Sequence, residues 1–212
     1  MAKKSITDDL AAKGYTIVEH VLSDRKCEVL KGSLPALDTA GSRILLSLKR
    51  FKDLAKDLRS NASLATYLSE LVAVECVFFN KTRDQNWAVT LHRDTVLPAM
   101  GRGEWSSAGT KEGMDCVKPT RQFMDQCLAV RVHLDGASKE DISVVPGSHL
   151  TEQQYERSEA IPIAVKKGAA LVLHPTLAHA SSKLHDGSNR RVLHYVFAPK
   201  QLPVGYDWYN AD

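Results

Sequence analysis

A series of short β-prone runs from residue 71 onward limits the possible folds of this chain more than any other feature. Turn signals such as Asp135-Gly136 and Pro146-Gly147 end some of these runs, and no helical pattern lies between them. Short strands joined by turns are typical of an antiparallel sandwich or barrel. The runs cover residues 71–79, 87–91, 128–134, 142–145, 161–165, 169–173 and 191–197.

The residues before these runs predict mainly helices. Ser23 is a good cap for a helix over 24–33, and apolar residues at three- and four-residue spacing predict further helices over 45–58 and 64–72. A short β-prone run covers residues 15–18. We therefore expect a single domain over 1–212, in which mainly helical residues 1–72 support a β core over 73–200.

The composition excludes several classes of protein. The formal net charge is +3 without a dense Lys/Arg cluster, which argues against a nucleic-acid-binding protein. No apolar signal segment begins the sequence and no run of about 18 apolar residues occurs in it, so we expect a cytoplasmic protein that does not enter a membrane. The scattered cysteines form no C-x-x-C pair, and we expect Cys27, Cys76, Cys116 and Cys127 to be reduced and buried.

The His92-Arg93-Asp94 segment at the end of a predicted strand is the first candidate metal site. Side chains two residues apart on a strand point to the same face, so His92 and Asp94 can bind one octahedral ion together. A third ligand from near residue 174–180 would complete a triangular set, and both His174 and His179 are available. The alternative interpretation is that His92 and Asp94 are solvated residues at a strand end.

One arginine, Arg190, follows the candidate metal ligands in the sequence. Arg190 follows His179 by eleven residues (190 − 179), where a guanidinium could bind the far carboxylate of a dicarboxylic keto acid, although a surface arginine is the simpler interpretation.

The glycine-rich segment 97–126 directly follows the His92-Arg93-Asp94 segment. A connection of this length inside a compact domain is often a lid, and we expect a lid here. Its landmarks are Gly101, Gly103, Trp105, Gly109, Gly113 and Met114.

Taken in order, these motifs resemble the phytanoyl-CoA dioxygenase family, a branch of the iron(II)- and 2-oxoglutarate-dependent oxygenases. The resemblance extends from about Gly14 to Pro199. It implies a double-stranded β-helix, a jelly-roll or cupin-like barrel, flanked by N-terminal helices. The motifs that carry it are His92-x-Asp94, Pro146-Gly147-Ser148-His149, His174-Pro175-x-x-x-His179-Ala180-Ser181 and Arg190.

The resemblance also implies roles for individual residues. Iron(II) would bind to His92, Asp94 and His179, because His179 precedes Ala-Ser and lies eleven residues before the arginine. Arg190 would bind 2-oxoglutarate with help from Ser181, and Arg191 is the runner-up. Roles for Lys81 and Arg131 in the co-substrate pocket follow less directly. The remaining residues are interpreted as structural: Arg93, the 146–149 turn, His133, His185 and His194.

The reaction implied by the resemblance is the oxidation of a small molecule by O2, with conversion of 2-oxoglutarate to succinate and CO2. Hydroxylation is the expected outcome, while desaturation or cyclisation stays open. Arg93, Arg102, Arg121 and Arg131 favour an anionic substrate. The alternatives are a non-catalytic cupin-like metal- or ligand-binding protein and a non-oxidative cupin-like enzyme. Neither the substrate nor the oligomeric state can be read from the sequence.

Overall fold

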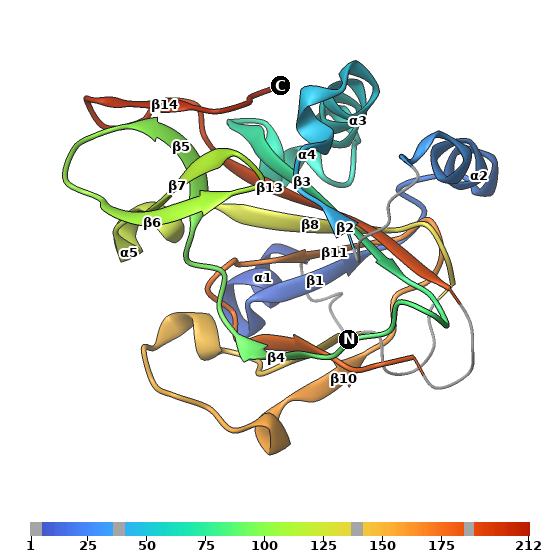
Figure 1. The fold of residues 1–212 in the computed structure, drawn as a ribbon. Coiled ribbons are helices and arrows are strands. Elements are labelled where there is room, and N and C mark those ends of the chain that lie inside the picture. The colour runs from blue at the N-terminus through green and yellow to red at the C-terminus, as the bar shows by residue number, and fades with distance from the viewer. Residues whose placement is uncertain (1–5, 36–40, 137–141, 185–188) are drawn as a thin grey trace.

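Two antiparallel sheets form the body of the protein. The computed structural model describes residues 6–35, 41–136, 142–184 and 189–212, and Figure 1 shows the sheets as two layers. The main sheet has the order β1 (Tyr15–Val18), β11 (Ala170–Leu173), β8 (Leu128–His133), β13 (Arg190–Pro199), β3 (Leu71–Lys81) and β2 (Gly41–Ser42). The second sheet has the order β10 (Ile161–Ile163), β9 (Ile142–Val144), β12 (His179–Ser181) and β4 (Val89–His92).

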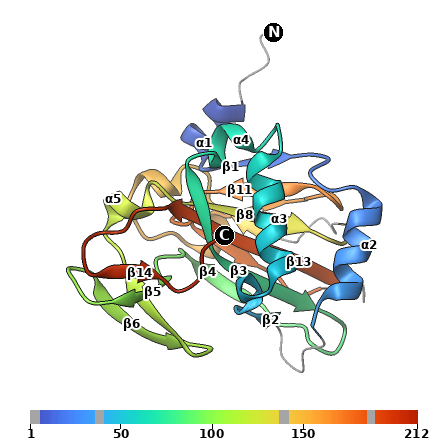
Figure 2. The ribbon, with the colours of Figure 1, turned by 90° about the horizontal axis from the view of Figure 1, so that it is seen from above.

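The N-terminal part of the chain forms helices that pack against the main sheet. They are α1 (Ile6–Lys13), α2 (Asp24–Ser33), α3 (Lys49–Ser60) and α4 (Ala65–Leu68), and a 3-10 turn (Leu45–Ser47) precedes α3. Figure 2 shows α3 running over the main sheet. The prediction of a helix over 64–72 is wrong beyond Leu68. Leu71 and Val72 instead begin β3, because their backbones pair with Pro199 and Ala198 of β13.

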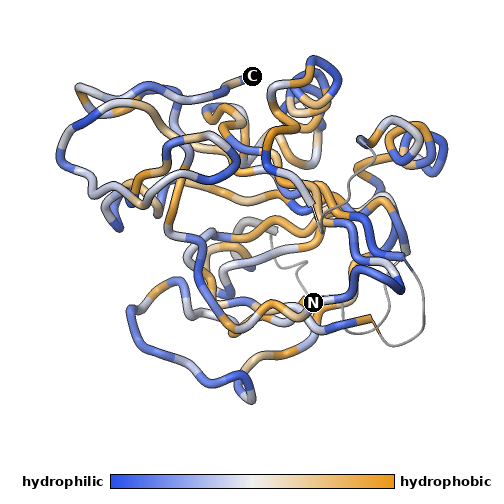
Figure 3. Tube along the Cα trace, viewed as in Figure 1, coloured by the Kyte–Doolittle hydropathy of each residue, from blue (hydrophilic) through white to orange (hydrophobic). Residues whose placement is uncertain are grey.

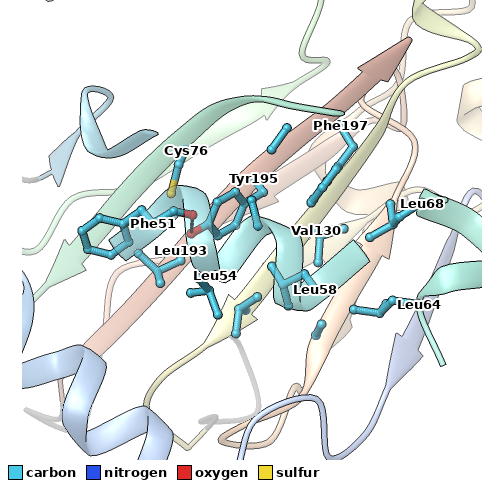
Figure 4. Packing of buried hydrophobic residues seen from close by; sticks show 14 of the residues in the cluster. Phe51, Leu54, Leu58, Leu64, Leu68, Cys76, Val130, Leu193, Tyr195 and Phe197 are labelled. Atoms are coloured by element: carbon cyan, nitrogen blue, oxygen red, sulfur yellow. Dashed lines mark hydrogen bonds between the residues drawn. The ribbon is translucent and has the colours of Figure 1, made fainter. Parts of the chain in front are cut away.

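Successive side chains of β13 point to opposite faces of the main sheet, so one face packs against the helices and the other faces the candidate functional site. Leu193, Tyr195 and Phe197 belong to the core cluster formed with the helices, whereas His194, between them, lines the cavities of the functional site. Figure 4 shows this packing, and full burial of each large side chain contributes about 1.5–3 kcal/mol. The helical side of the cluster includes Phe51, Leu54, Leu58, Leu64 and Leu68.

The segment 97–126 is built mostly of strands. A third sheet has the order β14 (Tyr206–Trp208), β5 (Leu97–Gly101), β7 (Met114–Lys118) and β6 (Ser106–Lys111), and α5 (Arg121–Met124) follows β7. Trp105 stacks on Tyr206 with ring centroids 4.8 Å apart, so the third sheet has its own aromatic packing. Whether the segment acts as a lid stays a prediction.

The remaining polypeptide agrees with the mainly β class expected from the sequence. Two short 3-10 turns (Ser148–Leu150 and Arg157–Glu159) lie in the connection between β9 and β10. Figure 3 shows hydrophobic residues along the strands of the main sheet and hydrophilic residues along much of this connection. All four cysteines are free and buried, and burial raises the pKa of Cys127 to about 12. Within the described ranges, every helix is too short or too polar to cross a membrane.

Candidate metal centre and adjoining cavities

Three side chains from two neighbouring strands converge in the second sheet. His92 ends β4, Asp94 lies two residues further on, and His179 begins β12 directly opposite His92 in the strand register. Asp94 Oδ1 lies 3.5 Å from His92 Nε2, and Asp94 Oδ2 lies 3.6 Å from His179 Nε2. One ligand atom from each residue lies within 4.8 Å of the other two, which is close enough for all three to bind one ion.

Backbone carbonyls determine which nitrogen of each imidazole faces this centre. The Nδ1 atoms of His92 and His179 lie 2.8 Å from the carbonyl oxygens of Thr90 and Leu177. Because a carbonyl oxygen can only accept, each Nδ1 must carry the proton. The Nε2 atoms therefore present lone pairs toward Asp94. A hydrogen bond of this kind commonly fixes the tautomer of a metal-binding histidine.

The protonation states also suit metal binding. Burial lowers the pKa of His179 to about 4, despite the nearby Asp94 charge, so the ring is neutral near pH 7. Burial of Asp94 acts to raise its pKa, but the adjacent histidines outweigh this effect and hold the pKa well below its usual range. Burial acts to lower the pKa of His92, but the adjacent Asp94 outweighs this effect and raises it, so an ion that binds this ring would displace a proton. Two imidazoles and one carboxylate are a donor set that fits iron(II) and leaves positions open for other ligands.

The 146–149 turn supports the strand that carries His179. Gly147 has φ +79°, a conformation that favours glycine, and Ser148 follows it in a buried position. The Ser148 hydroxyl accepts a hydrogen bond of 2.8 Å from the backbone N–H of Ala178, next to His179. The turn thus positions the candidate ligand, in line with its interpretation as structural.

His174 and Arg93 lie close in sequence to the candidate ligands, but their side chains do not join the metal centre. His174 stacks on His149, with ring centroids 4.7 Å apart, and does not join the group of potential ligands among the described residues. Arg93 points away from the centre. Its guanidinium donates to the backbone carbonyl oxygens of Thr176, Ser148, Thr151 and Gln153.

A buried polar cluster lines a cavity that also reaches the candidate ligands. Lys81 and Arg190 face each other across β3 and β13, and the Lys81 ammonium donates to Ser181 Oγ at 2.9 Å. The exposed fractions are 2% for Lys81, 6% for Arg190 and 8% for Ser181. This cavity of about 250 Å³, which we call the Arg190 cavity, also contacts His92, Asp94 and His179. The structure therefore places two cations and a hydroxyl beside the three potential metal ligands.

Arg191, the alternative for binding the keto acid, has a different partner. It alternates with Arg190 along β13, and its guanidinium donates to both carboxylate oxygens of Asp135 at 2.8 and 2.9 Å. Its backbone N–H donates to the same carboxylate at 2.9 Å. Arg191 thus ties β13 to the end of β8 and does not line the Arg190 cavity.

His194, which the sequence analysis interpreted as structural, lies beside the candidate metal centre. It accepts a hydrogen bond of 3.1 Å at Nδ1 from Arg131, because an arginine can only donate, and its Nε2–H lies 3.8 Å from Asp94 Oδ2. Burial lowers the pKa of His194 to about 3. Arg131 and His194 both line the Arg190 cavity. The position of His194 opposite Arg131 could have been inferred only from the register of β8 and β13.

The arginines expected to attract an anionic substrate are spread over different environments. Arg121 pairs with Asp125 at 2.6 Å and also donates to the His149 carbonyl oxygen. Arg131 binds His194, and Arg102 is exposed. His133 is buried, as expected for a core histidine, while His185 lies outside the described residues.

Comparison with known proteins identifies the family. The family model described as phytanoyl-CoA dioxygenase (PhyH) matches residues 38–192, which include all three potential ligands and Arg190. The chain belongs to the phytanoyl-CoA dioxygenase family. This confirms the resemblance inferred from the motifs, and membership makes the protein an oxygenase-type enzyme. No curated protein matches the sequence.

Solved structures share the fold of this phytanoyl-CoA dioxygenase family member at low sequence identity. HygX from Streptomyces hygroscopicus with nickel and 2-oxoglutarate bound is 16% identical, covers 100% of this chain and 98% of its own, and has a TM-score of 0.67. HygX has also been solved with iron, and with nickel, 2-oxoglutarate and hygromycin B. AviO1 from Streptomyces viridochromogenes Tue57 is 18% identical over 97% of this chain and 100% of its own, with a TM-score of 0.64.

A third neighbour with the same fold is described as a carbocyclase. SnoK, a non-heme α-ketoglutarate-dependent carbocyclase from nogalamycin biosynthesis, is 16% identical over 92% of this chain and 83% of its own, with a TM-score of 0.62. These similarities confirm the expected double-stranded β-helix. Iron and 2-oxoglutarate, the cofactors expected from the sequence, are bound in HygX structures of this fold.

Proposed function

We propose that this protein is an iron(II)- and 2-oxoglutarate-dependent dioxygenase that hydroxylates a small molecule. Iron(II) would bind to His92, Asp94 and His179, and 2-oxoglutarate would lie between the metal and Arg190. One observation carries this proposal. Three suitable donor atoms and a buried pair of cations line the same cavity, as a metal-chelating dicarboxylate requires. Membership of the phytanoyl-CoA dioxygenase family and the HygX structures support it.

The chain's own residues would orient the co-substrate. When bound, iron(II) would supply the centre at which O2 and 2-oxoglutarate react, with release of succinate and CO2 and transfer of one oxygen atom to the substrate. The Arg190 guanidinium can bind the far carboxylate through two parallel hydrogen bonds. Lys81 adds a second positive charge, and Ser181 offers a hydroxyl held by Lys81. Apolar neighbours, including Phe79, Ile142 and Val192, would exclude water from the bound co-substrate.

Asp94 favours oxygenation over halogenation. Its carboxylate occupies the position between the two histidines, and a halide would need that position to be empty. We therefore expect no halogenated product. Cyclisation by SnoK shows that other outcomes occur on this fold, so the products must be identified directly.

Anaerobic spectroscopy tests the assembly of the site. Addition of iron(II) and 2-oxoglutarate to the purified protein should produce a visible charge-transfer band, and exposure to O2 should then yield succinate. Absence of the band would favour a non-catalytic binding protein. Formation of the band with succinate release that requires both iron and O2 would exclude a non-oxidative cupin-like enzyme.

Substitution of the two candidate histidines tests the ligand assignment. We expect His179→Ala to abolish iron binding and turnover, because it removes one of three converging donors. We expect His174→Ala to retain measurable iron binding, because His174 stacks on His149 away from the centre. Metal analysis after anaerobic loading measures both. Retention of iron by the first variant with loss by the second would contradict the assignment.

A cytoplasmic location and the single-domain boundaries stay predictions.

A further inference from the structure

A second cavity adjoins the candidate metal centre on the side of the third sheet. We call it the Lys111 cavity; it has a volume of about 230 Å³, and its walls include Arg43, Glu75, Arg93, Thr95, Lys111 and Pro175. It shares Arg43, Phe79, His92, Asp94 and His194 with the Arg190 cavity. A molecule in this cavity would therefore lie beside the metal without competing for Arg190 or Lys81.

The charges around the Lys111 cavity leave one cation available. The Arg43 guanidinium pairs with the buried Glu75 carboxylate at 2.8 Å. The Arg93 guanidinium is occupied by backbone carbonyls, and Asp94 belongs to the metal centre. Among the described residues, the Lys111 ammonium forms no hydrogen bond or salt bridge, although its positive charge acts to lower the pKa of Glu75.

The turn of the hairpin that carries Lys111 contains a glutamate in a backbone conformation that favours glycine. Lys111 pairs with Met114 at the end of β6 and β7, and Glu112-Gly113 form the two-residue connection. Both have positive φ, +48° for Glu112 and +80° for Gly113, as a type I′ turn requires. Glycine and asparagine adopt this conformation readily, whereas glutamate pays about 1 kcal/mol for it. Such strain is often found where a residue has a specific task.

The Glu112 side chain accounts for this conformation. Its carboxylate accepts hydrogen bonds from the Ser42 hydroxyl at 2.9 Å and from the backbone N–H of Arg43 at 2.9 and 3.0 Å. These bonds fasten the hairpin tip to β2, which is distant in sequence and lies at the edge of the main sheet. The residue immediately before this anchor is Lys111, so the anchor holds the unpaired ammonium at the wall of the cavity.

We propose that the Lys111 cavity binds the primary substrate, and that Lys111 recognises an oxyanion on it, a carboxylate or a phosphate. This inference rests on the proposed function, because it places the substrate beside the iron(II) centre. It assigns the anionic preference to a lysine of the third sheet, and not to the arginines on which the sequence-based expectation depended. The third sheet then contributes to specificity through the tip of one hairpin.

Binding of simple oxyanions tests the proposal without knowledge of the substrate. The protein is loaded with zinc(II), which has no redox chemistry, and saturated with 2-oxoglutarate so that the Arg190 cavity is filled. Acetate and inorganic phosphate are then titrated separately, and the backbone amide signals of residues 110–113 are followed by NMR. The acetate and phosphate arms distinguish a carboxylate from a phosphate. We expect saturable shifts at the hairpin tip with at least one of them.

Variants separate recognition from folding. Lys111→Gln should weaken binding of the oxyanion about two- to fivefold, as expected for a partly exposed ion pair, while Lys111→Arg should retain binding. Lys166→Gln removes an equal charge from an exposed site and should have no effect. Glu112→Asn relieves the turn strain but removes the anchor, so it should weaken binding of the oxyanion while the protein stays folded, as judged by its melting transition.

The results are distinguishable from those for the proposed function. Unchanged affinity in Lys111→Gln, or shifts confined to other parts of the protein, would overturn the proposal. The anaerobic charge-transfer band is measured on the same variants, and it should persist in Lys111→Gln because that residue is not placed at the metal or at 2-oxoglutarate. Loss of the band in the wild-type protein would count against the proposed function, whatever the oxyanion titration shows.

Discussion

Substitution of Arg190 and of its neighbour Arg191 is the most direct test of the co-substrate site. Arg190 is 6% exposed and lines the cavity, whereas Arg191 is bound to Asp135. A hydrogen bond to a charged group contributes about 1.5–3 kcal/mol. Arg190→Gln removes two such bonds from the far carboxylate, but Lys81 stays nearby and offsets part of the loss. We therefore expect a net loss of about 3 kcal/mol, or roughly 100-fold in the Kd of 2-oxoglutarate.

The geometry of the guanidinium can be separated from its charge. Arg190→Lys keeps the positive charge but cannot form two parallel hydrogen bonds, so we expect a loss of about 1.4 kcal/mol, or roughly tenfold in Kd. Arg191→Gln is the matched control. It should leave the Kd within about twofold and lower the free energy of unfolding by about 1 kcal/mol, because a partly buried ion pair with Asp135 is lost.

The assay is an anaerobic titration of the iron(II) form with 2-oxoglutarate, followed by the charge-transfer absorbance. Urea unfolding of the same variants measures their stability. An equal or larger loss of affinity in Arg191→Gln than in Arg190→Gln would refute the assignment of the co-substrate to the Arg190 cavity.

Three further predictions concern the scaffold. Ser148→Ala removes the acceptor for the buried Ala178 N–H, so unfolding should become easier by about 1–3 kcal/mol and metal affinity should fall; unchanged values of both would remove the turn from the site. Phe51→Ala, at a fully buried position, should cost about 3–5 kcal/mol in urea unfolding, compared with less than about 0.5 kcal/mol for Val29→Ala at a position that is 60% exposed. Burial lowers the pKa of His133 to about 3, so the unfolded chain binds a proton that the folded chain does not, and the free energy of unfolding should decrease as pH falls below about 6.5. His133 alone should contribute about 2 kcal/mol of this decrease at pH 5, and His179 and His194, whose pKa values are also lowered, should add to it. A flat profile over this pH range would contradict that pKa.

Local patterns in the sequence were enough to predict the mainly β class and part of the site. The two-residue repeat of a strand places His92 and Asp94 on one face before any tertiary structure is known. The β-prone run at 71–79 became β3, and the run at 191–197 became β13, because both are mostly apolar and buried on both faces. The family resemblance, which depends on motif order and spacing, singled out His179 and Arg190.

Tertiary structure decided what depends on contacts between distant segments. The end of the predicted helix over 64–72 was wrong because pairing with β13 outweighs local helix propensity. The strands of segment 97–126 lack strong alternation, and they form only because β7 lies between β5 and β6 and β14 adds to β5 from the C-terminal end. No local pattern could reveal that Glu112 fastens this hairpin to Ser42, because those residues lie 70 positions apart. Sequence periodicity determines which way a side chain faces along its own strand, whereas the partner that it meets is determined by the register between strands.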